Sequence, residues 1–389
     1  RDRLRSRGLG DVYKRQIRVL HILYALNRGG IETFLMNIYR HIDREKVQFD
    51  FLINVHCECH YTKEIISLGG RIYDIPSRRE GVLKRRNALN LFFKAHPEYK
   101  IVHQHSSSLS DIMPLQAATK WGVPIRIIHS HNTKEGGSKF HEYIHRFNQL
   151  FINKYATDFY ACSDLAARWM YTRKQYINKN FTIIHNGIDL YQYKFDDESR
   201  WKLREEFGLK KEQLVIGNVS AFRIPKNHVF LLEIFAEFLL FQPDTHLFLV
   251  GDGDLRLRIE SKIRELNISE NVTLTGVRKD IPNLLSMFDV LLMPSLHEGL
   301  PVSVIEAQAT GIPCVLSSAI TSECKILDTL IFKSLTDSKQ KWCDAITQAA
   351  HVGRVLHAEK LVADVGYDIR FVSKMLLERY FKRLSELYL

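Results

Sequence analysis

Short apolar segments alternate with helical stretches along most of the chain, and this alternation limits the possible folds more than any other feature. The first apolar segment, residues 18–24, runs into the glycine pair Gly29 and Gly30, and a helical stretch follows over residues 31–41. A buried strand, a glycine turn and a helix form the opening unit of a doubly wound α/β domain. Repetition of such units predicts a parallel sheet covered by helices on both faces.

Two series of these units predict two Rossmann-like domains. Further strands of the first series are expected at residues 49–54, 71–75, 101–103 and 126–129. The second series predicts strands at residues 214–219, 245–250, 272–275, 290–293 and 314–317, and helices at 229–241, 254–266 and 281–286. We therefore expect domains at residues 17–188 and 189–370, a polar linker near 188–200, and a C-terminal helix at 371–389.

The composition narrows the class of protein. A chain of 389 residues with 45% hydrophobic and 25% charged residues is typical of a globular protein with two domains. No run of apolar residues approaches the roughly 18 that a membrane span needs. The N-terminal segment lacks the apolar stretch of a secretory signal, so no such signal is expected. The six cysteines form no CxxC pair, which fits a reducing compartment, so we expect a cytoplasmic protein.

The first sixteen residues do not belong to the repeated pattern. They fit neither a strand nor a helix of the fold and resemble a translated adapter or vector segment, so residues 1–16 are excluded from the fold prediction. They contain six basic and two acidic residues, which leaves the rest of the chain with +7 of the net charge of +11. This modest charge, without an aromatic and basic platform, argues against a nucleic-acid partner.

Residues 56–60 read His-Cys-Glu-Cys-His and resemble a metal site at first sight. Adjacent residues of an extended chain alternate between opposite faces, so they cannot all reach one ion. No second pair of ligands follows at the usual spacing. We interpret this segment as a surface loop that follows the strand at 49–54.

Residues 298–313 carry the strongest functional signal. Glu298 and Glu306 stand eight positions apart, and a short helix is expected to start at Pro301 and to stop at Gly311. Glu298 then lies in the turn before the helix, and Glu306 lies about two turns inside it. The free amides of the helix start lie between the two acids and favour a phosphate. A diphosphate with hydroxyl groups at both ends, such as a nucleotide-sugar, fits this layout.

The same segment resembles the signature of the retaining glycosyltransferases of family 4, which have the GT-B fold. That fold has two Rossmann-like domains facing a central cleft and a C-terminal helix that crosses back to the N-terminal domain. The resemblance covers the chain from about Ile17 to the C-terminus. It implies that Glu298 binds hydroxyls of the donor sugar and Glu306 binds the ribose. The neighbouring residues Ser295, Gly299, Leu300 and Pro301 complete this part of the predicted donor site.

Transfer of a sugar from a nucleoside diphosphate builds negative charge on the leaving phosphates, which fixed cations stabilise well. The resemblance implies that no divalent metal or other cofactor is needed. A pair of basic side chains is expected to stabilise the leaving diphosphate instead. Lys226 matches the family position of the lysine. The family's arginine position holds Ala221, and Arg223 follows two residues later. Either Arg223 reaches the diphosphate by a local shift, which we favour, or one phosphate contact is missing.

Glycine-containing loops follow the next two strands of the second domain. Gly251 and Gly253 allow the backbone to approach a ligand at the carboxyl edge of the sheet. The loop after the strand at 272–275 is placed at the nucleobase by the resemblance. Val277 and Arg278 are the candidates for its backbone contacts.

The first domain is less explicit. Gly29 and Gly30, followed by Glu32, resemble the family's Gly-Gly-x-Glu opening and are expected beneath the diphosphate or the acceptor. His131 follows the strand at 126–129 and is our candidate for the histidine that contacts the donor sugar and its developing charge. His105 is the second choice. By the same resemblance, His105, Asn132 and Glu32 are candidates for the acceptor side.

A basic cluster, residues 78–86, contains Arg78, Arg79, Lys84, Arg85 and Arg86. It fits an anionic membrane surface or a lipid-linked diphosphate acceptor. It fits a solvated helix face equally well. Both interpretations stay open at this stage.

The sequence thus predicts a metal-independent, retaining hexosyltransferase that uses a nucleotide-sugar, with a UDP-sugar as the expected donor. By analogy with the family, its acceptor is a saccharide or lipid-linked saccharide of surface or exported polysaccharide, at the inner face of the plasma membrane. One alternative is a sugar-nucleotide epimerase of the same fold, which the pattern around Glu298 argues against. Another alternative is a catalytically impaired partner subunit, and Ala221 is its only support.

Overall fold

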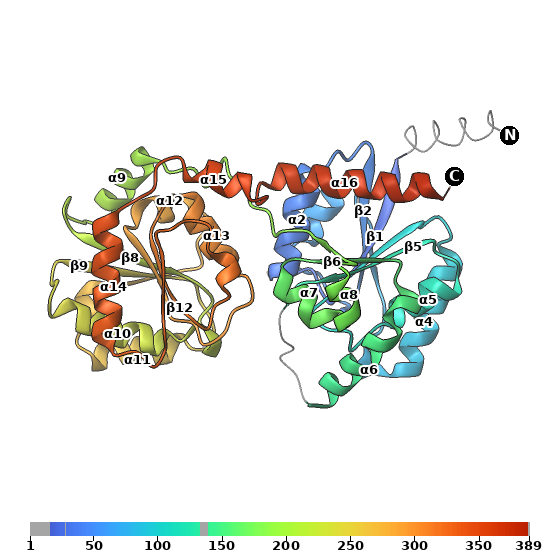
Figure 1. The fold of residues 1–389 in the computed structure, drawn as a ribbon, viewed down its shortest axis with the longest axis horizontal. Coiled ribbons are helices and arrows are strands. Elements are labelled where there is room, and N and C mark those ends of the chain that lie inside the picture. The colour runs from blue at the N-terminus through green and yellow to red at the C-terminus, as the bar shows by residue number, and fades with distance from the viewer. Residues whose placement is uncertain (1–15, 28, 133–138, 388–389) are drawn as a thin grey trace. The chain divides into compact units, whose positions relative to one another are not determined.

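The computed structural model describes residues 16–27, 29–132 and 139–387. The chain forms two compact units (Figure 1). The first contains the chain up to Gly187 together with the residues from Ile369 onward, and the second contains Ile188 to Asp368. The segment 1–16, which was predicted to be foreign, lies outside the described residues except for Gln16.

The first unit is built on a seven-stranded sheet in which every strand pairs in parallel with its neighbours. The strand order is β3-β2-β1-β4-β5-β6-β7. The strands are β1 (Ile17–Ile22), β2 (Val47–Ile53), β3 (Ile72–Asp74), β4 (Ile101–Ser106), β5 (Ile125–Ser130), β6 (Asp158–Ala161) and β7 (Thr182–Ile183). The predicted strands are all present, whereas β6 and β7 are short and were not predicted.

Helices cover both faces of this sheet (Figure 1). They are α2 (Gly30–His41), α3 (Thr62–Ser67), η1 (Arg78–Glu80), α4 (Val82–Ala95), α5 (Met113–Lys120), α6 (Lys139–Tyr155), α7 (Asp164–Met170), α8 (Arg173–Ile177) and α16 (Ile369–Glu386). Alternation along β1 serves both cores: Val19 packs with α2 and α16, and Leu20 packs with α4, α5 and α7.

The C-terminal helix α16 belongs to the first unit, although the whole second unit separates the two in sequence. Its apolar side, including Leu376 and Tyr380, is buried in the same core as α2. Arg383 pairs with Asp158 at the start of β6 at 2.7 Å. The predicted return of the last helix to the N-terminal domain is therefore seen, and the helix starts at Ile369, two residues before its predicted start.

The second unit contains a six-stranded parallel sheet with the order β10-β9-β8-β11-β12-β13. Its strands are β8 (Leu214–Val219), β9 (Thr245–Val250), β10 (Val272–Gly276), β11 (Val290–Met293), β12 (Cys314–Ser317) and β13 (Leu330–Lys333). Four of the five predicted strands have the predicted bounds, and β10 is one residue longer. Strand β13 was not predicted.

The helices of the second unit also form two layers. They are α9 (Asp197–Glu206), η2 (Ile224–Lys226), α10 (His228–Leu239), α11 (Arg256–Glu265), η3 (Ser269–Asn271), α12 (Ile281–Met287), α13 (Val302–Ala309), η4 (Ser322–Cys324), α14 (Lys339–Val352) and α15 (Ala358–Asp364). Helices α9, α12, α13 and α15 share one core with the sheet, and α10, α11 and α14 share the other. Within the described part of the chain, no helix has the length and apolar character needed to cross a bilayer.

Each sheet has one place where the strand order reverses. In the first unit β1 lies between β2 and β4, and in the second β8 lies between β9 and β11. The loops that leave the carboxyl ends of such neighbours turn to opposite sides, so a crevice opens between them, and ligands of doubly wound proteins bind there. We call these places the first switch point (β1/β4) and the second switch point (β8/β11).

Candidate functional site

The two loops of the second switch point are tied to each other by hydrogen bonds in both directions. The backbone N–H of Leu296, after β11, donates to the carbonyl of Pro225 at 2.8 Å. The side-chain amide of Asn227, after β8, donates to the carbonyl of Pro294 at 3.1 Å. Asn227 has φ 57°, the left-handed conformation that asparagine tolerates better than most residues. The loops therefore form one preorganised platform.

Lys226 and Glu298 form an ion pair on this platform. The hydroxyl of Ser295 also donates to Glu298, at 3.3 Å, and Ser295 is held by the Ser317 hydroxyl, which donates to its carbonyl at 2.5 Å. Both members of the pair are partly exposed, at 22% for Lys226 and 15% for Glu298. The cation predicted for the diphosphate and the carboxylate predicted for the sugar thus meet, although 72 positions separate them in the chain.

Helix α13 starts directly beyond Glu298. Pro301 is its N-cap residue and makes no side-chain cap, so the first amides of the helix have no intrahelical partner. Gly299 and Leu300 form the turn that leads into it. At the other end Gly311 has φ 77°, and a Cβ there would lie 2.0 Å from the carbonyl oxygen of Val355, so the predicted stop at Gly311 needs glycine.

Glu306 lies on the same helix, but closer to its start than predicted. It is the fifth residue of α13, about one turn inside rather than two, because the helix begins at Val302. The hydroxyl of Tyr193 donates to its carboxylate at 2.7 Å. Burial raises the pKa of Glu306, and the Tyr193 hydrogen bond opposes part of that rise. Burial beside Glu306 likewise holds the pKa of Tyr193 well above its usual value.

Arg223 stands apart from this network. Its side chain is exposed, and among the residues that the structure describes it has no ion-pair or hydrogen-bond partner. Its backbone N–H donates to the carbonyl of Ala221 at 2.8 Å, so the two residues share a tight turn. The guanidinium is therefore available to a ligand, while Ala221 offers only an exposed methyl group at the family's arginine position.

Gly251 and Gly253, which follow β9, were predicted to let the backbone approach a ligand, and close packing also requires glycine at both positions. A Cβ on Gly251 would lie 2.1 Å from the carbonyl oxygen of Ser220, and one on Gly253 would lie 2.6 Å from that of Phe222. The loop after β9 therefore rests on the loop after β8. In the following loop, Arg278 forks Asp280 at 2.6 and 2.8 Å, and Val277 is exposed. The guanidinium of Arg278 is thus engaged, and its backbone remains the candidate contact.

At the start of the first unit, Gly29 is the N-cap of α2 and Gly30 is its first residue. The carboxylate of Glu32 folds back over Gly29, where a Cβ would lie 2.3 Å from its Oε2, whereas the space around Gly30 is open. Burial raises the pKa of Glu32. The predicted Gly-Gly-x-Glu opening is thus a closed local unit at a helix start.

His131 and His105, the two histidines singled out from the sequence, lie 2.8 Å apart between Nε2 and Nδ1. They continue into a chain, because His105 Nε2 lies 2.9 Å from His21 Nδ1. A second chain runs beside it: His103 lies 2.7 Å from the Tyr380 hydroxyl and 3.2 Å from His129. We call these five histidines the histidine cluster. Asn132 follows His131 at the end of β5.

The histidine cluster lies beneath α2 and α16 and is held neutral by burial. Burial lowers the pKa of His21 and of His131 to about 3 and keeps those of the other three well below the usual value. Buried ring nitrogens of His21, His129 and His131 have no hydrogen-bond partner within the described parts of the chain. His131 is thus a partly buried, neutral group whose buried Nδ1 has no hydrogen-bond partner within the described residues.

His21, His103 and His129 were not among the residues predicted from the sequence, although a signal was present. Residues at positions i and i+2 of a strand share a face, and His103 with His105 and His129 with His131 follow that spacing on neighbouring strands. Two triads of the cluster bring one ring nitrogen from each residue within 4.8 Å of one another, as three metal ligands would. Both ring nitrogens of His103 and His105 already have hydrogen-bond partners, whereas one nitrogen each of His21, His129 and His131 has none within the described residues.

The loop at 56–60 presents its side chains in different directions, as predicted. Cys57 is exposed, while Cys59 is buried. His56 pairs with Asp74 and lies 3.5 Å from Glu80, which raises the pKa of this histidine. The segment therefore contributes an ion-pair network beside β3.

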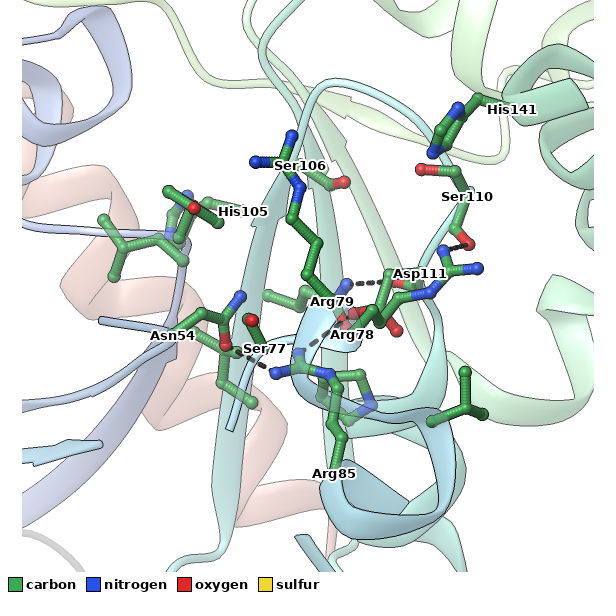
Figure 2. Close-up of a pocket in the computed structure, with 16 residues that line it drawn as sticks. Asn54, Ser77, Arg78, Arg79, Arg85, His105, Ser106, Ser110, Asp111 and His141 are labelled. Atoms are coloured by element: carbon green, nitrogen blue, oxygen red, sulfur yellow. Dashed lines mark hydrogen bonds and ion pairs between the residues drawn. The ribbon is translucent and has the colours of Figure 1, made fainter. Parts of the chain in front are cut away.

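The basic cluster divides into buried and exposed members. Arg85 is 1% exposed and reaches Asn54 at 2.7 Å, the Pro76 carbonyl at 2.9 Å and Asp111 at 2.9 Å, so the solvated-face interpretation is wrong for this residue. Lys84 pairs with Glu80 at 3.3 Å. Arg86 is exposed on α4. Together with Arg85, Arg78 and Arg79 line a pocket at the first switch point (Figure 2).

Comparison with known proteins identifies the family. Residues 28–192 match the model of Glycosyltransferase Family 4, and residues 199–368 match that of Glycosyl transferases group 1. The chain is 36% identical to the candidate glycosyltransferase EpsF of Bacillus subtilis (strain 168) over 364 residues, which is 91% of this chain and 93% of EpsF. The chain belongs to glycosyltransferase family 4.

Two further comparisons extend this result. The chain is 26% identical over 324 residues to an Escherichia coli galactosyltransferase, UDP-Gal:alpha-D-GlcNAc-diphosphoundecaprenol alpha-1,3-galactosyltransferase, covering 80% of this chain and 82% of that enzyme. The fold of this chain matches that of Anabaena Alr3699/HepE, which was solved in complex with UDP and glucose. The TM-score is 0.73 at 18% identity, and the match covers 94% of this chain and 99% of HepE. The predicted GT-B fold is confirmed, and the protein is a glycosyltransferase.

Proposed function

We propose that this glycosyltransferase moves a sugar from a UDP-sugar to an acceptor hydroxyl with retention of configuration. The observation that carries the proposal is the second switch point, where Lys226 and Glu298 meet before the uncapped start of α13 and Glu306 follows on the same helix. A cation, free helix amides and two carboxylates suit a diphosphate with hydroxyls on either side. The relatives support UDP, because HepE was solved with UDP and the E. coli enzyme uses UDP-Gal.

In this proposal Lys226, the amides of α13 and the unpartnered Arg223 stabilise the charge that builds on the leaving diphosphate. Glu298 accepts hydrogen bonds from hydroxyls of the transferred sugar, and Glu306 accepts them from the ribose. Because these groups already supply the positive charge, we propose that no divalent metal or other cofactor is required. Ser295, Gly299, Leu300 and Pro301 shape the sugar pocket, while the backbone at Val277 and Arg278 meets the nucleobase.

The bond between the anomeric carbon and the diphosphate oxygen breaks, and a bond from that carbon to the acceptor oxygen forms on the same face. The acceptor proton passes to the departing phosphate. We propose that His131, whose pKa burial lowers so that its ring is neutral, lies against the donor sugar. Gly29, Gly30 and Glu32 meet the diphosphate or acceptor, and His105 and Asn132 contribute to the acceptor side.

We further propose that the acceptor is a lipid-linked saccharide of surface or exported polysaccharide. The name of the E. coli relative supports this assignment, since its acceptor is a sugar on diphosphoundecaprenol. An acceptor of that type places the enzyme at the inner face of the plasma membrane, in the cytoplasm.

A catalytically impaired partner subunit is the second candidate, and the exposed Ala221 at the family's arginine position favours it. A donor screen separates the two functions. UDP-, GDP- and ADP-sugars are tested for thermal stabilisation of the protein, and the stabilising donor is then tested for slow hydrolysis. We expect stabilisation by a UDP-sugar and release of UDP. Stabilisation without any release, in the presence or absence of acceptors, supports the impaired subunit, and no stabilisation by any donor contradicts both functions.

A further inference from the structure

A pocket opens at the first switch point. Its volume is about 460 Å³, and its floor comes from the carboxyl ends of the two strands that form the switch point, β1 and β4. The opposite wall is formed by η1 and the start of α4, which bring Arg78, Arg79 and Arg85 to it (Figure 2). A doubly wound unit binds ligands at this place, and the sequence left open whether these arginines face a membrane, a diphosphate acceptor or solvent.

The charges in this pocket do not balance. Asp111 is the carboxylate of its lining, and Arg85 neutralises it at 2.9 Å. Arg78 donates to the carbonyl of Ser110 at 2.6 Å, a neutral partner that leaves its charge uncompensated. Arg79 has no ion-pair or hydrogen-bond partner in the described part of the chain, and no dashed contact reaches its guanidinium in Figure 2. The guanidinium charges of Arg78 and Arg79 are therefore available to bind an anion.

The lining also limits the kind of anion. Arg85 is 1% exposed and fixed by Asn54 and the Pro76 carbonyl, so this wall of the pocket is rigid. Two further guanidinium forks at the rim suit the several oxygens of a phosphate. The remaining lining carries hydroxyls from Ser77, Ser106 and Ser110 and the neutral ring of His105, none of which repels an anion. The volume accommodates a phosphate group with a sugar attached.

We infer that this pocket binds the phosphate or diphosphate group of the acceptor, with Arg79 and Arg78 as its ligands and Arg85 as the residue that fixes the wall behind them. This inference rests on the proposed function, since it assigns the acceptor to the class of sugar phosphates and sugar diphosphates. A pocket selects a small group, whereas the headgroups of a bilayer form an extended surface. The arginines are therefore assigned to the acceptor and not to the membrane.

Titration with inorganic pyrophosphate tests this subsite. The full chain, saturated with UDP, is titrated by calorimetry as wild type, Arg79→Gln, Arg78→Gln and Arg86→Gln. Arg79 and Arg86 are both exposed, and only Arg79 lines the pocket, so Arg86→Gln removes the same charge outside it. We expect pyrophosphate affinity to fall by about tenfold or more in Arg79→Gln and Arg78→Gln, and to stay within about twofold in Arg86→Gln.

Equal affinities in wild type and Arg79→Gln, or an equal loss in Arg86→Gln, would overturn the inference. A second arm uses vesicles that contain phosphatidylglycerol: loss of vesicle binding in Arg79→Gln with unchanged pyrophosphate affinity would assign the arginines to the membrane instead. If UDP does not bind at all, the proposed function fails, but the difference between Arg79→Gln and Arg86→Gln still decides the subsite. Unchanged thermal melting of the variants confirms that they fold.

Discussion

The two switch points have the same topology but opposite electrostatic character. At the second, opposite charges are already paired as Lys226 and Glu298, and the two loops are bonded to each other. At the first, five neutral histidines lie beneath α2 and α16, and the nearby pocket carries two unbalanced guanidinium groups. The parallel sheet therefore fixes where a ligand can bind, whereas the loops and strand ends decide which ligand it is.

The difference also has a thermodynamic side. An ion pair at a partly exposed edge can exchange its partner for a ligand without the cost of burying a charge. A buried neutral histidine cannot be protonated without that cost, which is why burial depresses the pKa values of the cluster. The first unit is therefore expected to be the more sensitive to acid, and the second to changes of single charges.

Acidification should produce the largest effect, and it should act on the first unit. The unfolded chain binds protons below pH 6.5, whereas the buried histidines resist protonation down to their depressed pKa values, about 3 for His21 and His131. Their stabilising effect is complete above pH 6.5 and is lost as the pH falls. Below pH 6.5, each buried histidine should lower the free energy of unfolding by on the order of 1 kcal/mol for every pH unit of acidification. Urea unfolding at pH 7.5 and 5.5 measures the loss.

Hydrogen exchange at the same two pH values locates this effect. Strands β1, β4 and β5 should lose protection at pH 5.5 before β8, β9 and β11 do. His357→Gln, at an exposed position, should keep the wild-type dependence on pH, and His131→Asn should reduce it. Equal loss of protection in both sheets would refute the electrostatic contrast.

Removal of the cation at the second switch point should have the next largest effect. Lys226→Ala deletes a charge that faces the leaving diphosphate and leaves Glu298 without its partner, so turnover should fall about 100- to 1000-fold. Arg223→Ala should reduce turnover at least as much. Lys210→Ala, an exposed lysine of the same unit paired with Asp244, serves as the control. Steady-state release of UDP is the measurement.

A wild-type rate in Arg223→Ala would mean that Ala221 marks a lost phosphate contact. A wild-type rate in Lys226→Ala would show that Lys226 does not stabilise the leaving diphosphate, and that its ion pair with Glu298 has no role in turnover.

Tyr193→Phe should have the smallest effect. It removes the hydrogen bond to Glu306, so UDP affinity should fall by about fivefold, corresponding to about 1 kcal/mol. The same bond holds down the pKa of Glu306, which burial raises above its ordinary value of 4.5. Without it the carboxyl protonates at higher pH, and UDP affinity should weaken earlier on acidification. Calorimetry at pH 7.5 and 5.5, with Tyr191→Phe as control, tests both effects; an identical pH dependence would contradict the role of Tyr193.

The second unit could be predicted from the sequence in detail because its buried strands are continuous apolar runs. β8, β9, β11 and β12 have the predicted bounds. The carboxyl ends of parallel strands meet at one edge, so Lys226 and Glu298 were assigned to one site across 72 positions. Three strands were not predicted. Strand β7 has only two residues, and β6 and β13, although as long as β11 and β12, each include a charged residue and are only partly buried, so neither is a continuous apolar run.

Long-range polar contacts could not be predicted in the same way. Tyr193 lies in a polar linker, and no spacing connects it with Glu306. The burial of Arg85 depends on Asn54, Pro76 and Asp111, which lie on other segments, so its run of charges resembled a solvated face. The spacing of the histidines was visible in the sequence, but their clustering could be recognised only once β1, β4 and β5 were known to be neighbours in the sheet.

We propose that the two switch points bind different ligands, with the nucleotide at the second. Calorimetric titration of UDP into wild type, Glu306→Gln and Arg79→Gln tests it directly. We expect at least about tenfold weaker binding in Glu306→Gln, because the ribose loses a charged acceptor, and wild-type affinity in Arg79→Gln. Wild-type affinity in Glu306→Gln, or an equal loss in Arg79→Gln, would contradict it.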